Sequence, residues 1–165
     1  MQAPTGNNAR ASDRSSRLDK LGIVLPEPPT PLGAYVESSD AGDLLFLSGM
    51  LPVVNGKLSI SGRLGENLSV KEGQDAARIA SLNALAVAKQ HLGTLDRVKK
   101  LVKLTVLMAT TEPFVDYAQV ADGASKIFVQ IFGPEAGHTR LVYGVQSLPI
   151  GAPVIVDCVF EIEPA

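Results

Sequence analysis

The sequence is short of the residues from which many sites and scaffolds are built. It has one cysteine, Cys158, no tryptophan and two histidines among 165 residues. A single thiol cannot close an internal disulfide, and no cysteine–histidine set with the spacing of a structural zinc site occurs in it. These absences exclude a disulfide scaffold and a zinc-stabilised domain, and they favour a reducing, cytoplasmic location.

Neither sign of charge is in excess, and no long hydrophobic run occurs. The 15 basic and 17 acidic residues give a net charge of -2 and a pI of about 5.7. Proteins that bind nucleic acid usually present a cationic surface to the phosphates, so we expect no nucleic-acid partner. No stretch approaches the roughly 18 consecutive apolar residues of a membrane span, so we expect no membrane partner either.

What is present is enough for one folded domain, because 45% of the residues are hydrophobic. Residues 1–20 are rich in Ser, Ala, Arg and Asn, and we predict that they form a flexible N-terminal extension. The segment 25–33, LPEPPTPLG, is too rich in proline for a helix and predicts an extended entry. A single domain is therefore expected over residues 21–165.

Alternating apolar residues and turn residues predict five or six strands. A first hairpin joins 34–37 to 44–48, and the Asn55-Gly56 pair predicts a second one. Further strands are predicted at 97–109, 139–145 and 153–161. In the last strand, the face that carries Cys158 is predicted to be core, and the face with Ile155, Asp157, Val159 and Glu161 is predicted to look the other way.

Two helices are predicted between these strands. Ser69 and Glu72 form a capping-box pattern, an alanine-rich stripe follows, and Gly93 supplies a stop. We expect the second helix to begin with Thr111 as its cap and Pro113 in its first turn, and to end at Gly133. Two helices cannot cover both faces of a sheet of this size, so the prediction is an α+β layer with both helices on one face.

The uncovered face is expected to carry Arg140 and Val142 from one strand, with Ile155 and Val159 from the last strand. Such an apolar face favours a symmetric oligomer. Arg140 itself opens an otherwise apolar strand. Its guanidinium is a planar fork of donors that matches a carboxylate, so it is a candidate anchor for a small acid, although a solvated or ion-paired arginine is the ordinary alternative.

Several segments in order carry a family resemblance. PPTPLGAYVES, LLFLSGMLP, SVKEGQDAARIASLNALAVAKQHLGTLDRVKKLVKLTVLM and HTRLVYGVQSLPIGAPVIVD resemble the Rid (YjgF-type) reactive-intermediate deaminase family, formerly labelled endoribonuclease L-PSP. The resemblance covers residues 21–162 and is strongest to a longer subgroup with an LPxPPxPxGxY opening. It implies a chorismate-mutase-like α+β fold, a homotrimer with clefts between subunits, and a hydrolase that needs no cofactor or metal. The implied reaction converts 2-enamino and 2-imino acids to 2-keto acids and ammonia.

The resemblance also implies site residues. Arg140 matches the arginine that binds the substrate carboxylate, Tyr35 matches a tyrosine that enters the cleft from a neighbouring chain, and Ser48 with Gly49 matches a pair at its floor. In many members a glutamate on the last strand holds the attacking water, and Ile155 stands at that position here.

This departure leaves the catalytic acid open. Asp157, two residues further along the same face, is the nearest carboxylate, and it could instead be a plain interface acid paired with Arg140. Asp122 is the nearest candidate for an asparagine of the family, and His138 is expected to be an exposed loop histidine. The first hypothesis is therefore an enamine/imine deaminase, and the second is a protein that binds small carboxylates without turnover. An endoribonuclease comes third, because two separated histidines and eight aromatic residues offer little for RNA.

Overall fold

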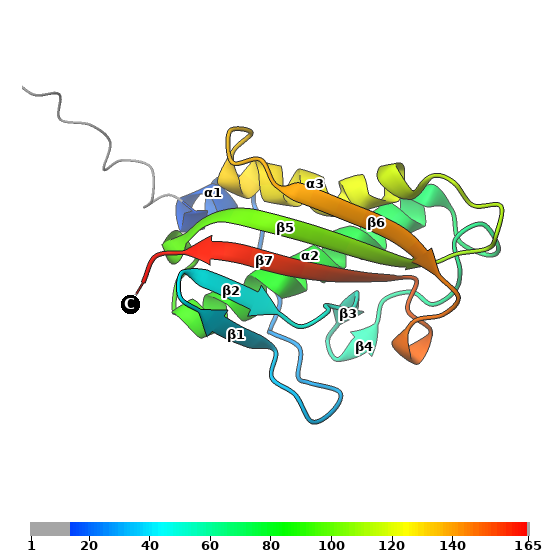
Figure 1. Ribbon diagram of the computed structural model, residues 1–165, viewed down its shortest axis with the longest axis horizontal. Coiled ribbons are helices and arrows are strands. Elements are labelled where there is room, and N and C mark those ends of the chain that lie inside the picture. The colour runs from blue at the N-terminus through cyan, green and yellow to red at the C-terminus, as the bar shows by residue number, and fades with distance from the viewer. Residues whose placement is uncertain (1–13, 165) are drawn as a thin grey trace, which may run out of the picture.

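A mixed five-stranded sheet with helices on one face forms the body of the protein (Figure 1). The computed structural model describes residues 14–164. The sheet order is β1-β2-β7-β5-β6, and every neighbouring pair is antiparallel except β5 and β6. The strands are β1 Ser38–Ala41, β2 Leu44–Leu47, β5 Val98–Ala109, β6 Thr139–Val145 and β7 Val154–Ile162, with a separate hairpin of β3 Val53–Val54 and β4 Lys57–Leu58.

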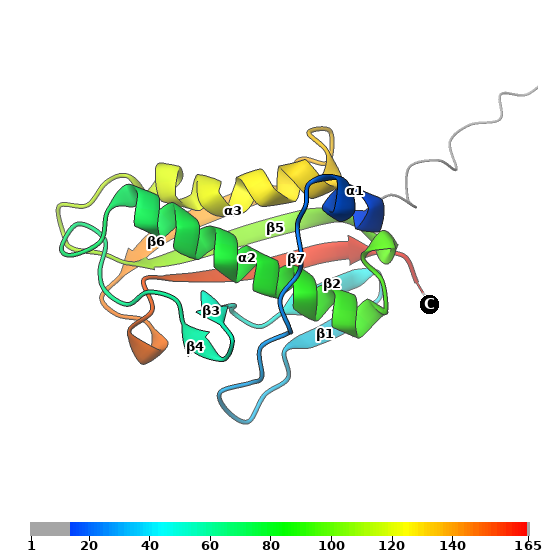
Figure 2. The same cartoon turned by 180° about the vertical axis from the view of Figure 1, so that it is seen from behind.

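The helices are α1 Arg14–Lys20, α2 Val70–Leu92 and α3 Tyr117–Phe132, with short 3-10 turns at η1 Leu95–Arg97 and η2 Pro149–Gly151. Figure 2 shows α2 and α3 side by side across the back of the sheet. The predicted α+β layer is therefore confirmed, with one helix more than expected. None of the helices within residues 14–164 is long and apolar enough to cross a membrane.

Helix α2 begins and ends where the sequence predicts. The Ser69 hydroxyl accepts from the Glu72 amide at 3.2 Å, and the Glu72 carboxylate accepts from the Ser69 amide at 2.8 Å. The hydrogen bonds that the Ser69 amide and hydroxyl donate to the Glu72 carboxylate lower the pKa of Glu72. At the other end Gly93 has a φ of 81°, and its amide donates to the carbonyl of Lys89.

Helix α3 begins later than predicted. The first helical residue is Tyr117, and Thr111 lies in the preceding loop, where its amide donates to the carbonyl of Leu64 at 3.0 Å. The prediction of a start at Thr111 and Pro113 is wrong, because this long-range hydrogen bond holds the segment against another loop. The predicted end at Gly133 is confirmed.

The first hairpin is also shifted. Residues 34–37 form no strand, since the amide of Tyr35 donates to the carbonyl of Gly33 and bends the chain there. The strand begins at Ser38, which pairs with Leu47. The second hairpin is confirmed, with left-handed φ values of 51° at Asn55 and 74° at Gly56.

Residues 14–20, predicted to belong to a flexible extension, form α1, which packs against the rest of the domain. Leu18 is buried, and the Arg14 guanidinium donates to the carbonyl of Lys99 at 2.9 Å and lies 5.5 Å from the centre of the Phe132 ring. The Asp96 carboxylate accepts from the amide of Arg14 at 3.0 Å. The packed structure therefore begins before residue 21, and the rest of the predicted extension lies outside the described residues.

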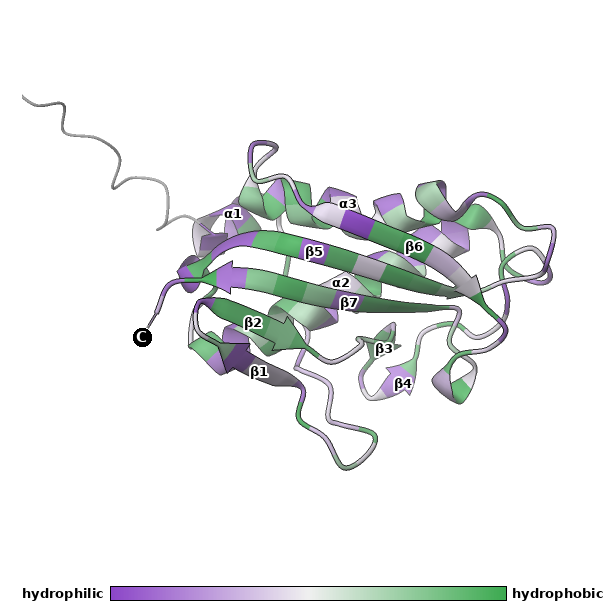
Figure 3. Cartoon of the chain, in the orientation of Figure 1, coloured by the Kyte–Doolittle hydropathy of each residue, from purple (hydrophilic) through white to green (hydrophobic). Residues whose placement is uncertain are grey.

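The two faces of the sheet differ. The predicted core face of β7 is confirmed, with Cys158 fully buried and its thiol pKa raised well above the usual value by burial. The face without helices exposes large apolar side chains. Figure 3 shows that most strands of the sheet are largely hydrophobic along their length. Phe46, Leu141 and Tyr143 are each more than two-fifths exposed. The open face therefore carries exposed apolar side chains together with charged ones, among them Asp157 and Glu161 of β7.

Candidate active site

Arg140 lies on the helix side of the sheet. In the parallel pairing of β5 with β6, Arg140 is opposite Leu104 and Val142 is opposite Val106, and both of these partners are buried in the core. The prediction that Arg140 and Val142 lie on the open face is therefore wrong. The sequence predicts that residues of β6 alternate between the two faces of the sheet. Which of the two alternating sets faces the helices depends on the register of β6 with β5.

Helix α3 holds the guanidinium of Arg140 at one corner. Its Nη1 atom donates to the Asp122 carboxylate at 2.8 Å and to the Ser125 hydroxyl at 3.1 Å. Among the described residues, its Nε and Nη2 atoms have no hydrogen-bond partner. Together they form a two-donor edge, the arrangement that matches a carboxylate. Asp122 is thus brought to Arg140, and it leaves the two-donor edge of Nε and Nη2 open.

His138 lies in the loop before β6, as expected, but it is half-buried rather than exposed. Its Nε2 atom lies 3.0 Å from the Ser125 hydroxyl, and its ring meets the edge of Phe128. Burial, and then the positive charge of Arg140, lower the pKa of His138, so the ring is neutral near pH 7. His138 therefore completes a hydrogen-bonded chain that runs through Ser125 to Arg140.

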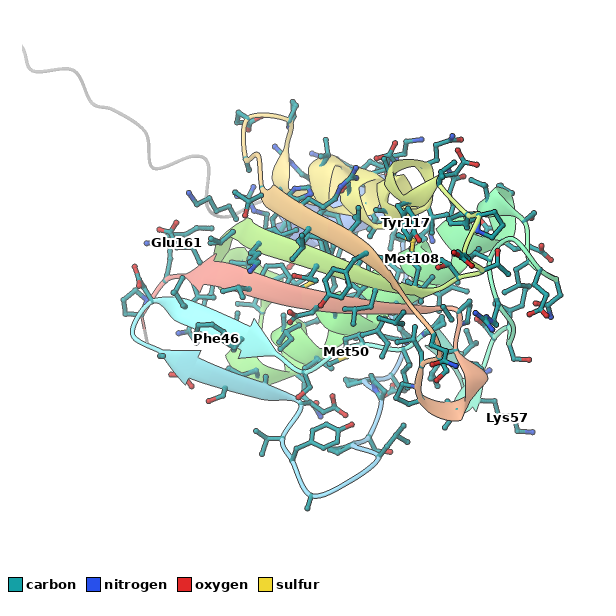
Figure 4. All side chains as sticks on the ribbon, turned by 45° about the vertical axis from the view of Figure 1, so that its right-hand side comes forward. Phe46, Met50, Lys57, Met108, Tyr117 and Glu161 are labelled. Atoms are coloured by element: carbon teal, nitrogen blue, oxygen red, sulfur yellow. The ribbon has the colours of Figure 1, made fainter. Side chains whose placement is uncertain are left out.

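A small pocket lies where the proline segment meets the end of β2 and η2. Tyr35, Glu37, Gly49, Met50 and Ile150 are among its lining residues, and its volume is about 100 Å³. Figure 4 shows Met50 just beyond β2, on which Phe46 is also labelled. The volume is below the roughly 300–1,000 Å³ of pockets for drug-sized ligands, so the pocket suits a ligand of few atoms.

Backbone strain occurs at the same pocket. Ile150 has a φ of 53°, a left-handed conformation that is unfavourable for a β-branched side chain. Strain of this kind is concentrated at functional sites, so it supports a role for the pocket.

Ser48 and Gly49 contribute in different ways. The Ser48 hydroxyl donates to the carbonyl of Val36 at 2.6 Å and its amide donates to the carbonyl of Glu37 at 2.9 Å, so Ser48 fixes the backbone of the pocket wall. Gly49 lines the pocket itself. A Cβ on Gly49 would lie 2.8 Å from Cγ2 of Ile155, so Ile155 packs directly on the Gly49 backbone.

Asp157 joins neither Arg140 nor the pocket. It pairs with Thr105 on the open face, whereas Arg140 faces the helices, so the ion pair considered from the sequence does not form. Burial raises the pKa of Asp157, and the nearby charge of Lys103 partly opposes that shift.

Glu37 is the pocket residue that the sequence analysis missed. Glu37 lines the pocket together with Tyr35 and Gly49, and burial raises the pKa of its carboxyl group. Strand alternation could not have identified it, because residues 34–37 form no strand and the chain bends at Tyr35.

Arg140 and the pocket lie in different parts of the sheet. Arg140 is on β6, an edge strand, with its side chain against α3, and it is not among the residues that line the pocket. Met50, which lines the pocket, bridges to Val156 of β7, and β5 lies between β7 and β6. Arg140 and Tyr35 therefore do not line one pocket within one chain. Two larger hollows, of about 480 and 380 Å³, lie beside the proline segment and α2, and none of the candidate residues lines them.

Known proteins are similar to this chain in sequence and in fold. The family described as "YjgF/chorismate mutase-like, putative endoribonuclease" matches residues 15–162. The chain belongs to this family. Protein TCP17 of Trypanosoma cruzi is 40% identical over 149 residues, which cover 90% of this chain and 93% of that protein.

Solved structures agree with the family. A crystal structure from Shewanella oneidensis has a TM-score of 0.86 and 34% identity, and the match covers 90% of this chain and 99% of that one. RidA from an Antarctic Psychrobacter species has a TM-score of 0.58 and 21% identity, with 82% and 94% covered, which shows the shared fold alone. The resemblance to the Rid/YjgF family and the chorismate-mutase-like fold are therefore confirmed.

Proposed function

We propose that the protein hydrolyses small 2-enamino and 2-imino acids to 2-keto acids and ammonia, in clefts formed between copies of the chain. The observation that carries this proposal is the open Nε–Nη2 edge of Arg140, whose third nitrogen is held by Asp122 and Ser125. An edge fixed in this way is prepared for one planar carboxylate.

A second copy of the chain is needed to complete the site. Arg140 is not among the residues that line the pocket around Tyr35, so in this proposal the arginine of one subunit approaches the pocket of another. The apolar open face gives the subunits a surface through which to associate, since it exposes Phe46, Leu141 and Tyr143. We propose a symmetric trimer as the assembly.

This reaction needs few functional groups from the protein. An imine carbon is already electrophilic, so catalysis requires that the substrate be oriented and that a water be placed beside that carbon. A bidentate arginine fixes the plane of the carboxylate and hence that of the adjoining imine. No metal or cofactor is required by this reaction.

The alternative is binding of a small carboxylate, such as a 2-keto acid, without turnover. Ile155 favours it, because an aliphatic side chain packs on Gly49 where the resemblance implies a glutamate. RNA cleavage is not favoured by the pocket, since no basic side chain is among the residues that line it and phosphate binding would require one.

The test generates an imino acid in place with an amino-acid oxidase and follows the release of 2-keto acid with and without the protein. Arg140→Ala should lower kcat/KM by about 10- to 100-fold, because a charge-assisted hydrogen bond contributes about 1.5–3 kcal/mol. Arg78→Ala is the matched control, as Arg78 is exposed on α2 away from both regions. Its kcat/KM should equal that of the wild type.

Three outcomes separate the hypotheses. Acceleration that is lost in Arg140→Ala and kept in Arg78→Ala supports the deaminase. Calorimetric binding of a keto acid that requires Arg140, with no turnover of any imine tested, supports the binding protein. Acceleration that survives in Arg140→Ala refutes the role of the arginine.

A further inference from the structure

We propose that Glu37 is the general base of this site and activates the water that attacks the imine carbon. This inference rests on the proposed deaminase function and adds to it a catalytic residue that the sequence analysis did not identify. It follows from the position of Glu37, from the lack of any partner for its carboxylate, and from the way its backbone is held.

Position comes first. Of the two acids considered, only Glu37 lines the pocket with Tyr35 and Gly49, whereas Asp157 lies on the open face opposite Thr105. No other acidic side chain is among the lining residues of that pocket. A water that enters this small space therefore meets one carboxylate.

The carboxylate of Glu37 is also unused by the fold. It is partly buried, and among residues 14–164 it forms no hydrogen bond or ion pair. A carboxylate that loses water contacts without gaining a partner costs stability, which is typical of a group retained for function. Burial also raises its pKa, which makes it a better proton acceptor at neutral pH than a fully solvated glutamate.

The backbone around Glu37 is fixed on the side of β2. The amide of Ser48 donates to the carbonyl of Glu37 at 2.9 Å, and the Ser48 hydroxyl donates to the carbonyl of Val36 at 2.6 Å. These two bonds clamp successive peptide units beside the pocket wall. Ser48 is thereby a positioning residue for Glu37 rather than a contact of the ligand.

The reaction adds one water to the imine and then releases ammonia. The water oxygen forms a bond to the carbon of the protonated imine while Glu37 accepts one proton of that water, and the product is a carbinolamine. Glu37 returns the proton to the amino nitrogen. The C–N bond then breaks, ammonia leaves, and the hydroxyl proton passes through Glu37 to the ammonia as the keto group forms. Water is consumed, 2-keto acid and ammonium are released, and Glu37 ends as a carboxylate.

The pH dependence of kcat provides a specific readout. Glu37 acts as a base only when ionised, so kcat should fall on the acid side of neutrality through its raised pKa. Tyr35 is the only other ionisable side chain that lines the pocket, and Arg140 of a second copy would add a positive charge that opposes the effect of burial.

The experiment compares Glu37→Gln, Asp157→Asn and the wild type in the oxidase-coupled assay, with Glu27→Gln as the control. Glu27 is exposed in the same proline-rich region and lies outside the pocket. Glu37→Gln should lower kcat by about 100-fold or more with KM changed less than threefold, since general base catalysis contributes about 10²- to 10⁴-fold. It should also remove the acid limb of the pH profile. Asp157→Asn and Glu27→Gln should keep the wild-type kcat and the acid limb of the pH profile.

Failure of the inference can be told from failure of the proposed function. If the wild type accelerates hydrolysis and the kcat of Glu37→Gln lies within threefold of the wild-type kcat, Glu37 is not the base. A loss of activity in Glu37→Gln that accompanies a loss of the oligomer in sedimentation, or an equal loss in Asp157→Asn, overturns the assignment as well. If the wild type shows no acceleration at all, the deaminase proposal fails, and the catalytic role of Glu37 fails with it.

Discussion

Helices α2 and α3 approach each other closely at Gly123, and we predict that a side chain at this position pushes them apart. A Cβ at this position would lie 2.2 Å from the backbone carbonyl oxygen of Gln74, more than 1 Å inside the 3.4 Å at which ordinary contact begins. A backbone oxygen within a helix cannot rotate away. Gly123→Ala therefore forces α3 to retreat from α2, and α3 is the helix that carries Asp122 to Arg140.

Two opposing effects, overpacking and helix propensity, set the change in the free energy of unfolding of Gly123→Ala. A gap of about 0.5–1 Å forfeits a quarter to a half of the dispersion energy of each contact, and α3 buries Val120, Ile127 and Phe128. Overpacking of this kind costs about 1–3 kcal/mol, and the immobile neighbour places Gly123→Ala near 3 kcal/mol. Alanine recovers about 1 kcal/mol through its helix propensity. The net loss in the free energy of unfolding is thus about 2 kcal/mol.

Urea denaturation at a fixed protein concentration measures this loss. With a slope of about 2 kcal/mol per molar urea, the midpoint should fall by about 1 M. Gly73→Ala is the matched control, because this second helical glycine faces the side-chain ends of Leu64 at 2.7 Å and Val120 at 3.0 Å, which can move. Its midpoint should stay close to that of the wild type. Equal midpoints for the two variants would refute the argument from backbone contact.

Three further predictions concern α1, the open face and the arginine. Leu18→Ala should lower the free energy of unfolding by about 2 kcal/mol, since Leu18 is buried, and an unchanged urea midpoint would mean that α1 is not docked. Burial raises the folded pKa of Asp157, so stability falls as pH rises above the unfolded value, and Asp157→Asn should be more stable than the wild type at pH 7 but not at pH 3. Asp122→Asn should tighten keto-acid binding by Arg140 about two- to fivefold in calorimetry, because an exposed ion pair contributes up to about 1 kcal/mol, whereas weaker binding would mean that Asp122 acts chiefly by positioning.

Local signals in the sequence predicted much of the fold. The capping box at Ser69, the stop at Gly93 and the Asn55-Gly56 turn depend on neighbouring residues only, and all three are present as predicted. The start of α3 and the helix α1 depend on long-range contacts, from Thr111 to Leu64 and from Arg14 to Asp96. No local pattern specifies such contacts, so both were misjudged.

The candidate site shows the same division. That Arg140 alternates with its neighbours along a strand could be predicted, but its face follows from the pairing with Leu104, which belongs to a distant segment. The ion pair of Arg140 with Asp157, which the sequence left as an alternative, does not form for that reason. Glu37 could not be found by strand alternation, because residues 34–37 form no strand, and its place in the pocket follows from the folded path of that segment.

The ion pair with Asp122 limits how Arg140 can attract a ligand. The two opposite charges lie 2.8 Å apart, so together they exert a weaker long-range pull on an anion than a lone guanidinium would. In the proposed function, affinity then comes from the geometry of the two open donors and from the small pocket that we propose a second copy supplies. A carboxylate on a compact, planar group satisfies both, whereas a phosphate-rich polymer would depend on the long-range attraction that Asp122 weakens. The pairing of Arg140 with Asp122 therefore favours a small keto or imino acid over RNA at this site.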